Sequence, residues 1–311
     1  MLQILVVTAH DRTARLLEAL AGLPGIENLI VLDGAARQLD GDAVLFDVHN
    51  ESANPVFRAL RELGVDSDGG ITVQQVDATL RAKPRPSPPG REIAPVWEMV
   101  EATIRDGASY APSFFILLII AGLIGATGIL TNSQILIVGA MVVGPEYSAI
   151  ISAALGISTR DRSAVRAGLL ALACGFTAAI VFSLAFALAV RAAGTAPEPF
   201  VHGTRPVSDL INRPNEFSVV VAILAGIVGV VSLTQARAGA MIGVFISVTT
   251  IPAAADIGVS AAFGRWPEAG GSSVQLLLNV VLLVVVGAGG LSTQRFIWHR
   301  RHRAVPTPPP R

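Results

Sequence analysis

The sequence has 311 residues, of which 52% are hydrophobic and only 15% are charged, and its mean hydropathy is +0.60. Because ordinary soluble domains carry about a quarter charged residues, this composition excludes a wholly soluble protein and indicates a membrane protein with room for one soluble domain. The net charge of zero hides an asymmetry, since residues 1–80 hold twelve acidic residues against five Arg and the basic excess lies in residues 81–311.

Residues 1–80 are predicted to form a ferredoxin-like α+β domain. Apolar, β-branched runs indicate strands, and leucines or aromatic residues at helical spacing indicate helices. A loop begins at Asp33-Gly34, and Asn54-Pro55 supplies an N-cap and first turn for the second helix. The order βαββαβ is ferredoxin-like, and right-handed crossovers place both helices on one face of a four-stranded antiparallel sheet. The predicted elements are Gln3–Thr8, Thr13–Leu23, Ile26–Leu32, Ala43–Val48, a helix from Asn54, and Ile71–Val76.

Two polar clusters occupy equivalent places in the two halves of this domain. His10-Asp11-Arg12 follows the first strand, and His49-Asn50-Glu51 follows the third. Because these strands run antiparallel, we expect the two histidines at opposite ends of the sheet, where they meet only across a subunit interface. The clusters are interpreted either as surface caps or as a regulatory ligand-binding site. No metal-binding or phosphate-loop motif occurs here, so we expect no metal and no catalytic residue.

A linker and an interfacial helix are predicted to connect this domain to the membrane. Residues 81–92 are rich in Pro and Arg, which predicts a stiff, basic spacer that also suits an anionic leaflet. Residues 93–110 are predicted to form an interfacial amphipathic helix, with Trp97 and Tyr110 as interfacial aromatics.

Hydropathy predicts six membrane spans within residues 111–298, followed by a basic, Pro-rich disordered tail, 299–311. Arginines cluster in the loop Arg160–Arg166, at Arg237 and in the tail, which fall on one side if the chain crosses six times. The positive-inside rule makes that side cytoplasmic, so both termini are expected in the cytoplasm. The predicted spans are Ser113–Leu130, Ile135–Gly156, Val165–Val190, Phe217–Thr234, Ala238–Phe263 and Val274–Phe296.

The second span contains a proline and an acid in its middle. Pro145 has no N–H, so the carbonyl of Met141 loses its helical partner. Glu146 then places a carboxyl at hydrocarbon depth, which favours either a structural cap or a cation or proton site. The fifth span resembles it, with Pro252 followed by Asp256. The predicted ion or substrate pathway comprises Met141, Gly144, Pro145, Glu146, Thr249, Thr250, Pro252 and Asp256.

Short motifs recur between the two halves of the membrane region. Ala121–Gly125 matches Ala225–Gly229, and Gly139-Ala140-Met141 matches Gly239-Ala240-Met241. Each half contains three predicted spans, an odd number, so the halves enter the membrane from opposite sides. Inverted repeats with interrupted helices are typical of transporters. The alternative is that small residues and prolines only serve helix packing.

At these motifs the sequence resembles a bacterial family catalogued as domain of unknown function 389. The resemblance covers roughly residues 98–295 and is carried by GAMVVGPE within Ile135–Gly156, by the Arg160–Arg166 loop, and by IPAAADIG within Arg237–Gly264. It implies a multi-span protein of the bacterial inner membrane and names no substrate.

Together these features predict a non-enzymatic transporter or channel for an ion or small solute. Its cytosolic domain is expected to bind a small ligand, such as a nucleotide, by fold-level analogy. The same analogy predicts a homo-oligomer, specifically a trimer. We expect no cofactor and no nucleic-acid partner. The alternative is a membrane-anchored receptor or scaffold without transport, and an intramembrane hydrolase ranks third.

Overall fold

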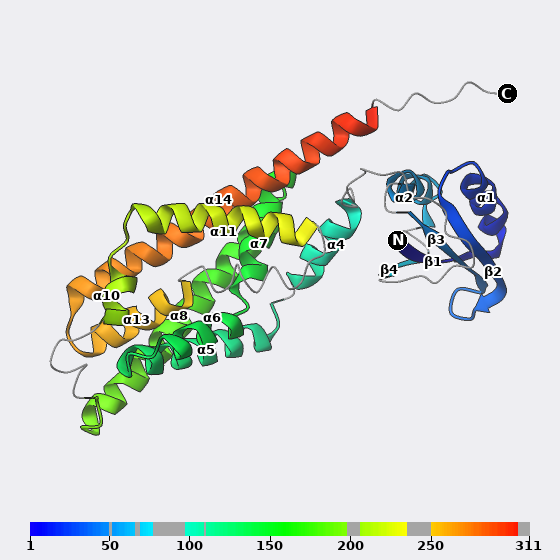
Figure 1. Ribbon diagram of the computed structural model, residues 1–311. Coiled ribbons are helices and arrows are strands. Elements are labelled where there is room, and N and C mark those ends of the chain that lie inside the picture. The colour runs from blue at the N-terminus through cyan, green and yellow to red at the C-terminus, as the bar shows by residue number, and fades with distance from the viewer. Residues whose placement is uncertain are drawn as a thin grey trace. The chain divides into compact units, whose positions relative to one another are not determined.

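The computed structural model describes residues 1–49, 52–65, 69–76, 97–108, 110–197, 206–234 and 250–303. The chain divides into two compact units, Met1–Ala102 and Thr103–Arg311. The first contains a small β-sheet with helices, and the second is helical (Figure 1).

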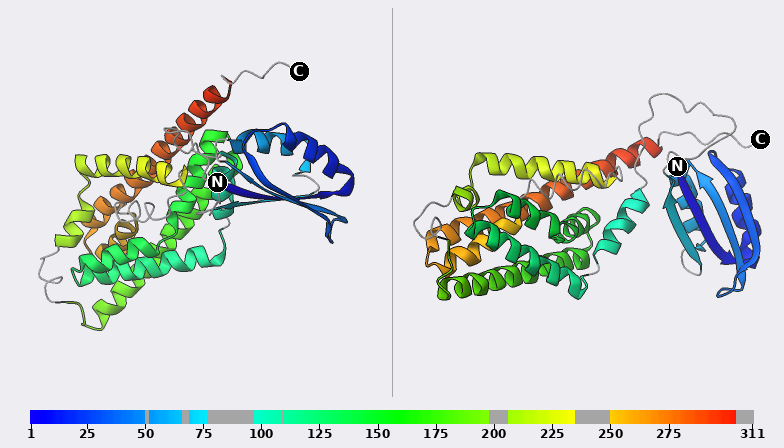
Figure 2. Two further views of the ribbon diagram at one scale, coloured as in Figure 1. Left: turned by 45° about the vertical axis from the view of Figure 1, so that its right-hand side comes forward. Right: turned by 60° about the horizontal axis from the view of Figure 1, so that its bottom comes forward.

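The N-terminal unit is built on an antiparallel sheet with the strand order β2-β3-β1-β4. Alternate residues of β1, such as Leu2, Ile4 and Val6, are buried, as expected for a strand with one covered face. They share a core with Leu16 of α1 and Leu60 of α2, so both helices cover the same face (Figure 2). The elements are β1 (Leu2–Ala9), α1 (His10–Ala21), β2 (Ile26–Ala36), β3 (Gly41–Val48), α2 (Ala53–Glu62) and β4 (Gly70–Gln75).

Three predicted boundaries in this unit are wrong. Helix α1 begins at His10 and not at Thr13. Strand β2 continues to Ala36 through the predicted loop, because an irregularity in its pairing with β3 accommodates Gly34 at a φ of 64°. Ser52 occupies the N-cap of α2, and Asn54 is buried inside the first turn, so it does not cap the helix.

The second unit consists of helices that are mostly apolar. Four of them are long and apolar enough to cross a membrane, and a fifth span is present if the bent pair α6 and α7 is counted as one. This composition identifies a membrane protein. The helices described from α4 onward are α4 (Trp97–Gly107), α5 (Pro112–Leu130), α6 (Gln134–Val143), α7 (Glu146–Thr159), α8 (Arg162–Ala192), α10 (Pro206–Asn212), α11 (Glu216–Thr234), α13 (Thr250–Ala262) and α14 (Trp266–Arg303).

The described residues thus contain four or five of the six predicted spans. Of the predicted span Ala238–Phe263, only α13 and Phe263 are described, and α13 has 13 residues. The C-terminal tail was predicted to be disordered from residue 299, whereas α14 continues through Arg303. The linker 81–92, Asn50, Glu51, Thr249 and the Gly239-Ala240-Met241 motif lie outside the described residues.

Close packing in this unit depends on small residues where helices cross. Helix α7 packs against α8 and α14, and α13 packs against α5, α8 and α14. A Cβ on Gly258 of α13 would lie 2.7 Å from the carbonyl oxygen of Ile180 on α8, and one on Gly168 of α8 would lie 2.8 Å from that of Ala149 on α7. Without side chains at these two positions the backbones approach closely, which is the usual mode of helix association in membranes.

Candidate functional site

The break between α6 and α7 is a bend of 51°. Helix α6 ends at Val143, Gly144 is extended, and Pro145 occupies the N-cap of α7. Because Pro145 has no N–H, the hydrogen-bond ladder cannot continue through this point. The bend therefore separates α6 from a new helix start, and Glu146 is the first residue of α7.

Glu146 is 5% exposed and is held by a residue far away in the sequence. Its Oε1 accepts a hydrogen bond of 2.8 Å from the hydroxyl of Thr250, at the start of α13. Its Oε2 is buried and has no hydrogen-bond partner among the described residues. The carboxyl of Glu146 thus links the helix break to α13 and keeps one oxygen available for a proton or a cation.

The absence of a side chain at Gly144 is required by this arrangement. A Cβ at this position would collide with Oε2 of Glu146 and lie 2.6 Å from Cδ1 of Ile251 on α13. Gly144 therefore lets α13 approach the break closely enough for Thr250 to reach Glu146.

Tyr147 also belongs to this site, although the sequence did not single it out. Its ring is buried, and its hydroxyl lies so close to Gly229 of α11 that a Cβ there would collide with it. The first turn of α7 thus contacts α13 through Glu146 and α11 through Tyr147. The only sequence feature that could have indicated Tyr147 is its position directly after Pro145 and Glu146.

Asp256 forms a separate polar cluster. It is 0% exposed, and both carboxyl oxygens accept hydrogen bonds, one of 2.7 Å from Ser208 on α10 and one of 2.6 Å from Ser272 on α14. Asn212 donates in turn to the Ser208 hydroxyl at 3.4 Å. The cluster ties three helices together. Neither serine was predicted, because a lone serine in an apolar sequence carries no pattern.

The structure therefore brings together only part of the predicted pathway. Gly144, Glu146 and Thr250 are in contact. Asp256 is six residues beyond Thr250, about 9 Å along α13, and has its own partners. Met141 lies in an apolar core cluster, and Pro252 is buried in the first turn of α13.

Residues 141–285 match the family model described as Domain of unknown function (DUF389). This segment of the second unit is therefore similar to the DUF389 family. The DUF389 match contains Glu146, Thr250 and Asp256, so the two buried acids both fall within it. No curated protein and no solved structure matches the chain significantly.

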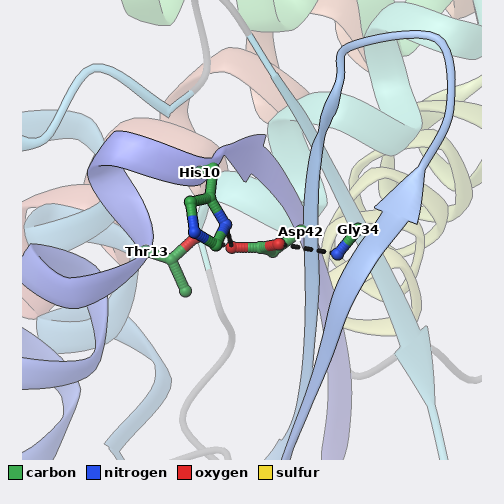
Figure 3. Close-up of polar contacts among 4 residues, drawn as sticks. All are labelled: His10, Thr13, Gly34 and Asp42. Atoms are coloured by element: carbon green, nitrogen blue, oxygen red, sulfur yellow. Dashed lines mark hydrogen bonds and ion pairs between the residues drawn. The ribbon is translucent and has the colours of Figure 1, made fainter.

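The N-terminal unit, which lies outside the DUF389 match, holds a further polar cluster around Asp42 (Figure 3). Asp42 is 0% exposed, and its Oδ2 accepts a hydrogen bond of 2.6 Å from the Thr13 hydroxyl and lies 2.8 Å from Nδ1 of His10. Its Oδ1 accepts a hydrogen bond of 2.8 Å from the N–H of Gly34. The hydrogen bonds from Thr13, Gly34 and His10 lower the pKa of Asp42 to about 2. The hydrogen bond to Asp42 raises the pKa of His10, whose side chain is 77% exposed.

Of the other predicted ligand residues in the N-terminal unit, His49 lies apart from His10. Ala9 pairs with Gly41 and Leu2 pairs with Val48, so His10 and His49 follow opposite ends of the sheet, as predicted. His49 contacts Glu27 through Nε2 at 3.3 Å. Among the other predicted residues, Asp11 lies in the first turn of α1 and Arg12 donates to the carbonyl of Gly64. Within the described residues, no group of three or more His, Cys, Asp or Glu is placed to hold a metal ion.

Proposed function

We propose that this protein is a membrane transporter or channel for an ion or small solute, and that Glu146 is its proton- or cation-binding group. The observation that carries the proposal is the buried carboxyl of Glu146 at the helix break. One of its oxygens is bound by Thr250, and the other has no hydrogen-bond partner among the described residues.

The energetics favour an exchangeable ligand at this carboxyl. A buried carboxylate is costly unless its charge is compensated, and one hydroxyl donor compensates it only partly. A proton or a cation bound at Oε2 provides the rest of the charge compensation. Because Thr250 and Ile251 of α13 contact the same place, binding or release at Glu146 alters the contact between α7 and α13. This is the coupling that alternating access requires.

A six-span inverted repeat is part of this proposal. The related motifs Ala121–Gly125 and Ala225–Gly229 lie on α5 and α11, which pack on the long helices α8 and α14 respectively. In addition, α7 packs on α14 and α13 packs on α8, so each half contacts the long helix of the other. This reciprocal packing supports two related halves with a binding site between them.

The N-terminal unit is proposed to be a ferredoxin-like sensor on the cytoplasmic side of a bacterial inner membrane. Its element order and its strand order β2-β3-β1-β4 support this fold. We propose that it binds a small ligand, such as a nucleotide, between subunits of a homotrimer. The placement of His10 and His49 at opposite sheet ends supports a shared site, because one subunit cannot bring them together.

Reconstitution of the full chain into liposomes tests the transport proposal. Imposed proton, Na⁺ and K⁺ gradients should drive flux through the wild type, read by a trapped pH dye and by a potential-sensitive dye. Glu146→Gln should abolish the pH- or ion-dependent part of that flux. Glu216→Gln is the matched control, because Glu216 also lies in the first turn of a membrane helix but is exposed.

Two outcomes would overturn the proposal. The first is equal flux in the wild type and in Glu146→Gln at every pH. The second is a wild type that folds and binds a ligand but carries no flux under any gradient, which would favour the receptor or scaffold alternative.

A further inference from the structure

An open groove with three arginines in its lining lies on the surface of α7 and α8. Its volume is about 790 Å³, and almost all of its surface is apolar. Three arginines belong to its lining, and all three come from one short stretch of chain where α7 ends and α8 begins. The remaining lining residues are Gly156, Ile157, Val165, Leu169, Leu170 and Ala173.

The local fold gathers the three arginines at one end of the groove. Arg160 takes a left-handed conformation with a φ of 60° as the C-cap of α7, and Arg162 is the first residue of α8. Arg166 follows one turn later, on the same face of α8 as Arg162. All three side chains are exposed. The acid between them, Asp161, is the N-cap of α8 and accepts hydrogen bonds from the N–H groups of Ser163 and Ala164.

This basic end lies where a membrane surface is expected. Helix α8 has 31 residues, about 46 Å, whereas the hydrocarbon core of a bilayer is about 30 Å thick. Its terminal turns therefore extend to the level of the lipid headgroups. Below the arginines the groove runs along exposed Leu169 and Leu170 to Ala173. The arginines therefore match the headgroup region of one leaflet, and the apolar lining matches its hydrocarbon.

The apolar part of the groove continues further down α8. A second hollow of about 480 Å³ shares Ala173 and is also lined by Cys174, Thr177, Ala178, Val181 and Phe182. From Arg166 to Phe182 the helix rises about 24 Å, which exceeds the thickness of one leaflet's hydrocarbon, about 15 Å. The two hollows together therefore have the length to hold an extended acyl chain.

We propose that this groove binds one anionic phospholipid. Its phosphate and acidic headgroup contact Arg160, Arg162 and Arg166, and one acyl chain lies against Leu169, Leu170 and Ala173. Guanidinium groups suit this role because their fork of N–H donors matches phosphate oxygens. The proposal rests on the groove alone and is independent of the proposed transport function.

Native mass spectrometry of the detergent-solubilised full chain tests the headgroup contacts. The protein is titrated with dioleoyl phosphatidylglycerol or with dioleoyl phosphatidylcholine. Three arginines at the headgroup should give a preference of about tenfold or more for phosphatidylglycerol, with one molecule retained. The triple variant R160Q/R162Q/R166Q should reduce this preference to about twofold or less, and R166Q alone should reduce it partly. The control R15Q/R37Q/R213Q removes the same charge from exposed residues outside the groove and should keep the wild-type preference.

A second pair of variants tests the acyl-chain contacts. Ala173→Trp fills the groove and leaves every charge in place, so it should lose the retained phosphatidylglycerol. Ala167→Trp adds the same bulk to an exposed position of α8 outside the groove lining and should retain it. Gel filtration and a melting curve verify folding of each variant. If the triple variant does not fold, R166Q and Ala173→Trp still decide the outcome.

Three results would overturn the lipid site. Equal retention of the two lipids would show that the arginines do not discriminate between the two headgroups. An equal loss in the control triple variant would show a general charge effect. Disulfide cross-linking of two copies through Cys174, together with absence of retained phosphatidylglycerol, would show that the groove is an interface between subunits.

Discussion

The hydroxyl of Thr250 donates a hydrogen bond of 2.8 Å to Oε1 of Glu146, across 104 positions of sequence. This contact ties α13 to the first turn of α7, directly after the helix break. It is also the only hydrogen bond from another side chain recorded for the Glu146 carboxyl among the described residues. The following experiments test what this contact and the break around it do.

Thr250→Val should destabilise the membrane unit, because it removes the only side-chain hydrogen-bond donor described for the buried carboxyl of Glu146. We expect a loss of about 1–3 kcal/mol, measured as a lower melting temperature in detergent. Thr250→Ser keeps the hydroxyl and should restore most of the loss. Thr177→Val is the control, since Thr177 is exposed on α8. A melting curve for Thr250→Val like that of the control would refute the importance of this contact.

Gly144→Ala should be destabilising by about 1–3 kcal/mol, because the added methyl group meets the Ile251 side chain and the Glu146 carboxyl. Gly139→Ala, in the middle of α6, meets nothing within 4 Å and should be neutral or stabilising by up to about 1 kcal/mol. Thermal unfolding of both variants in the same detergent measures the difference. Equal stability of the two would show that α13 does not approach the break as described.

Glu146→Gln separates a binding role from a capping role. If Glu146 binds a proton or cation, the neutral, similarly sized Gln should leave the melting temperature nearly unchanged while ion- or pH-dependent flux is lost. If Glu146 is only a cap, Gln should reduce stability by about 1 kcal/mol while the flux survives. The paired measurement is a melting curve in detergent and flux in liposomes across pH. Normal flux together with a lowered melting temperature would decide for the cap.

The proposed topology predicts opposite labelling of two positions. In a background in which Cys174 is replaced by Ser, a cysteine at Ser163, in the first turn of α8, should react with an impermeant maleimide only from the cytoplasmic side, because the stretch Arg160–Arg166 is basic. A cysteine at Thr204 should react only from the other side. Whole cells and inverted vesicles provide the two directions. Labelling of both from one side would contradict the six-span arrangement.

The N-terminal unit is expected to fold alone, because its sheet and two helices share one core. A fragment of residues 1–80 should give an α/β circular dichroism spectrum and a cooperative melt. A disordered spectrum would remove the proposed sensor.

The same fragment should show a pH dependence that originates at the Asp42 cluster. The pKa of Asp42 is lowered to about 2, below its ordinary value of 3.8, so its stabilising contribution is present above pH 3.8 and is lost as pH falls towards 2. The pKa of His10 is raised, so its contribution is present below its ordinary pKa of 6.5 and is lost as pH rises through the raised value.

Urea unfolding of the fragment across pH measures both effects. Asp42→Asn should reduce the change in the free energy of unfolding between pH 3.8 and about 2. His10→Gln should reduce the change above pH 6.5. An unchanged pH profile in both variants would show that the cluster does not form in solution.

Local patterns in the sequence determined much of this architecture. Apolar length predicted the membrane helices, and Pro145 predicted the break, because a missing N–H in the interior of a helix interrupts its hydrogen bonds. Alternation and helical spacing predicted the order of strands and helices in the N-terminal unit, and the antiparallel arrangement predicted that His10 and His49 lie at opposite ends. The starts of α1 and α2 were missed because caps depend on one or two residues and on what is buried around them.

Only the tertiary structure decided the partners of the buried acids. Thr250 reaches Glu146, and Ser208 and Ser272 reach Asp256, because α13 packs against other helices at particular depths. A hydroxyl in an apolar sequence has no periodicity that indicates its distant partner. The sequence placed Glu146 and Asp256 in one pathway, whereas side-chain reach separates them into two sites with different partners. The local sequence determines where helices and strands form. The packing of the helices determines which residues far apart in the sequence come into contact.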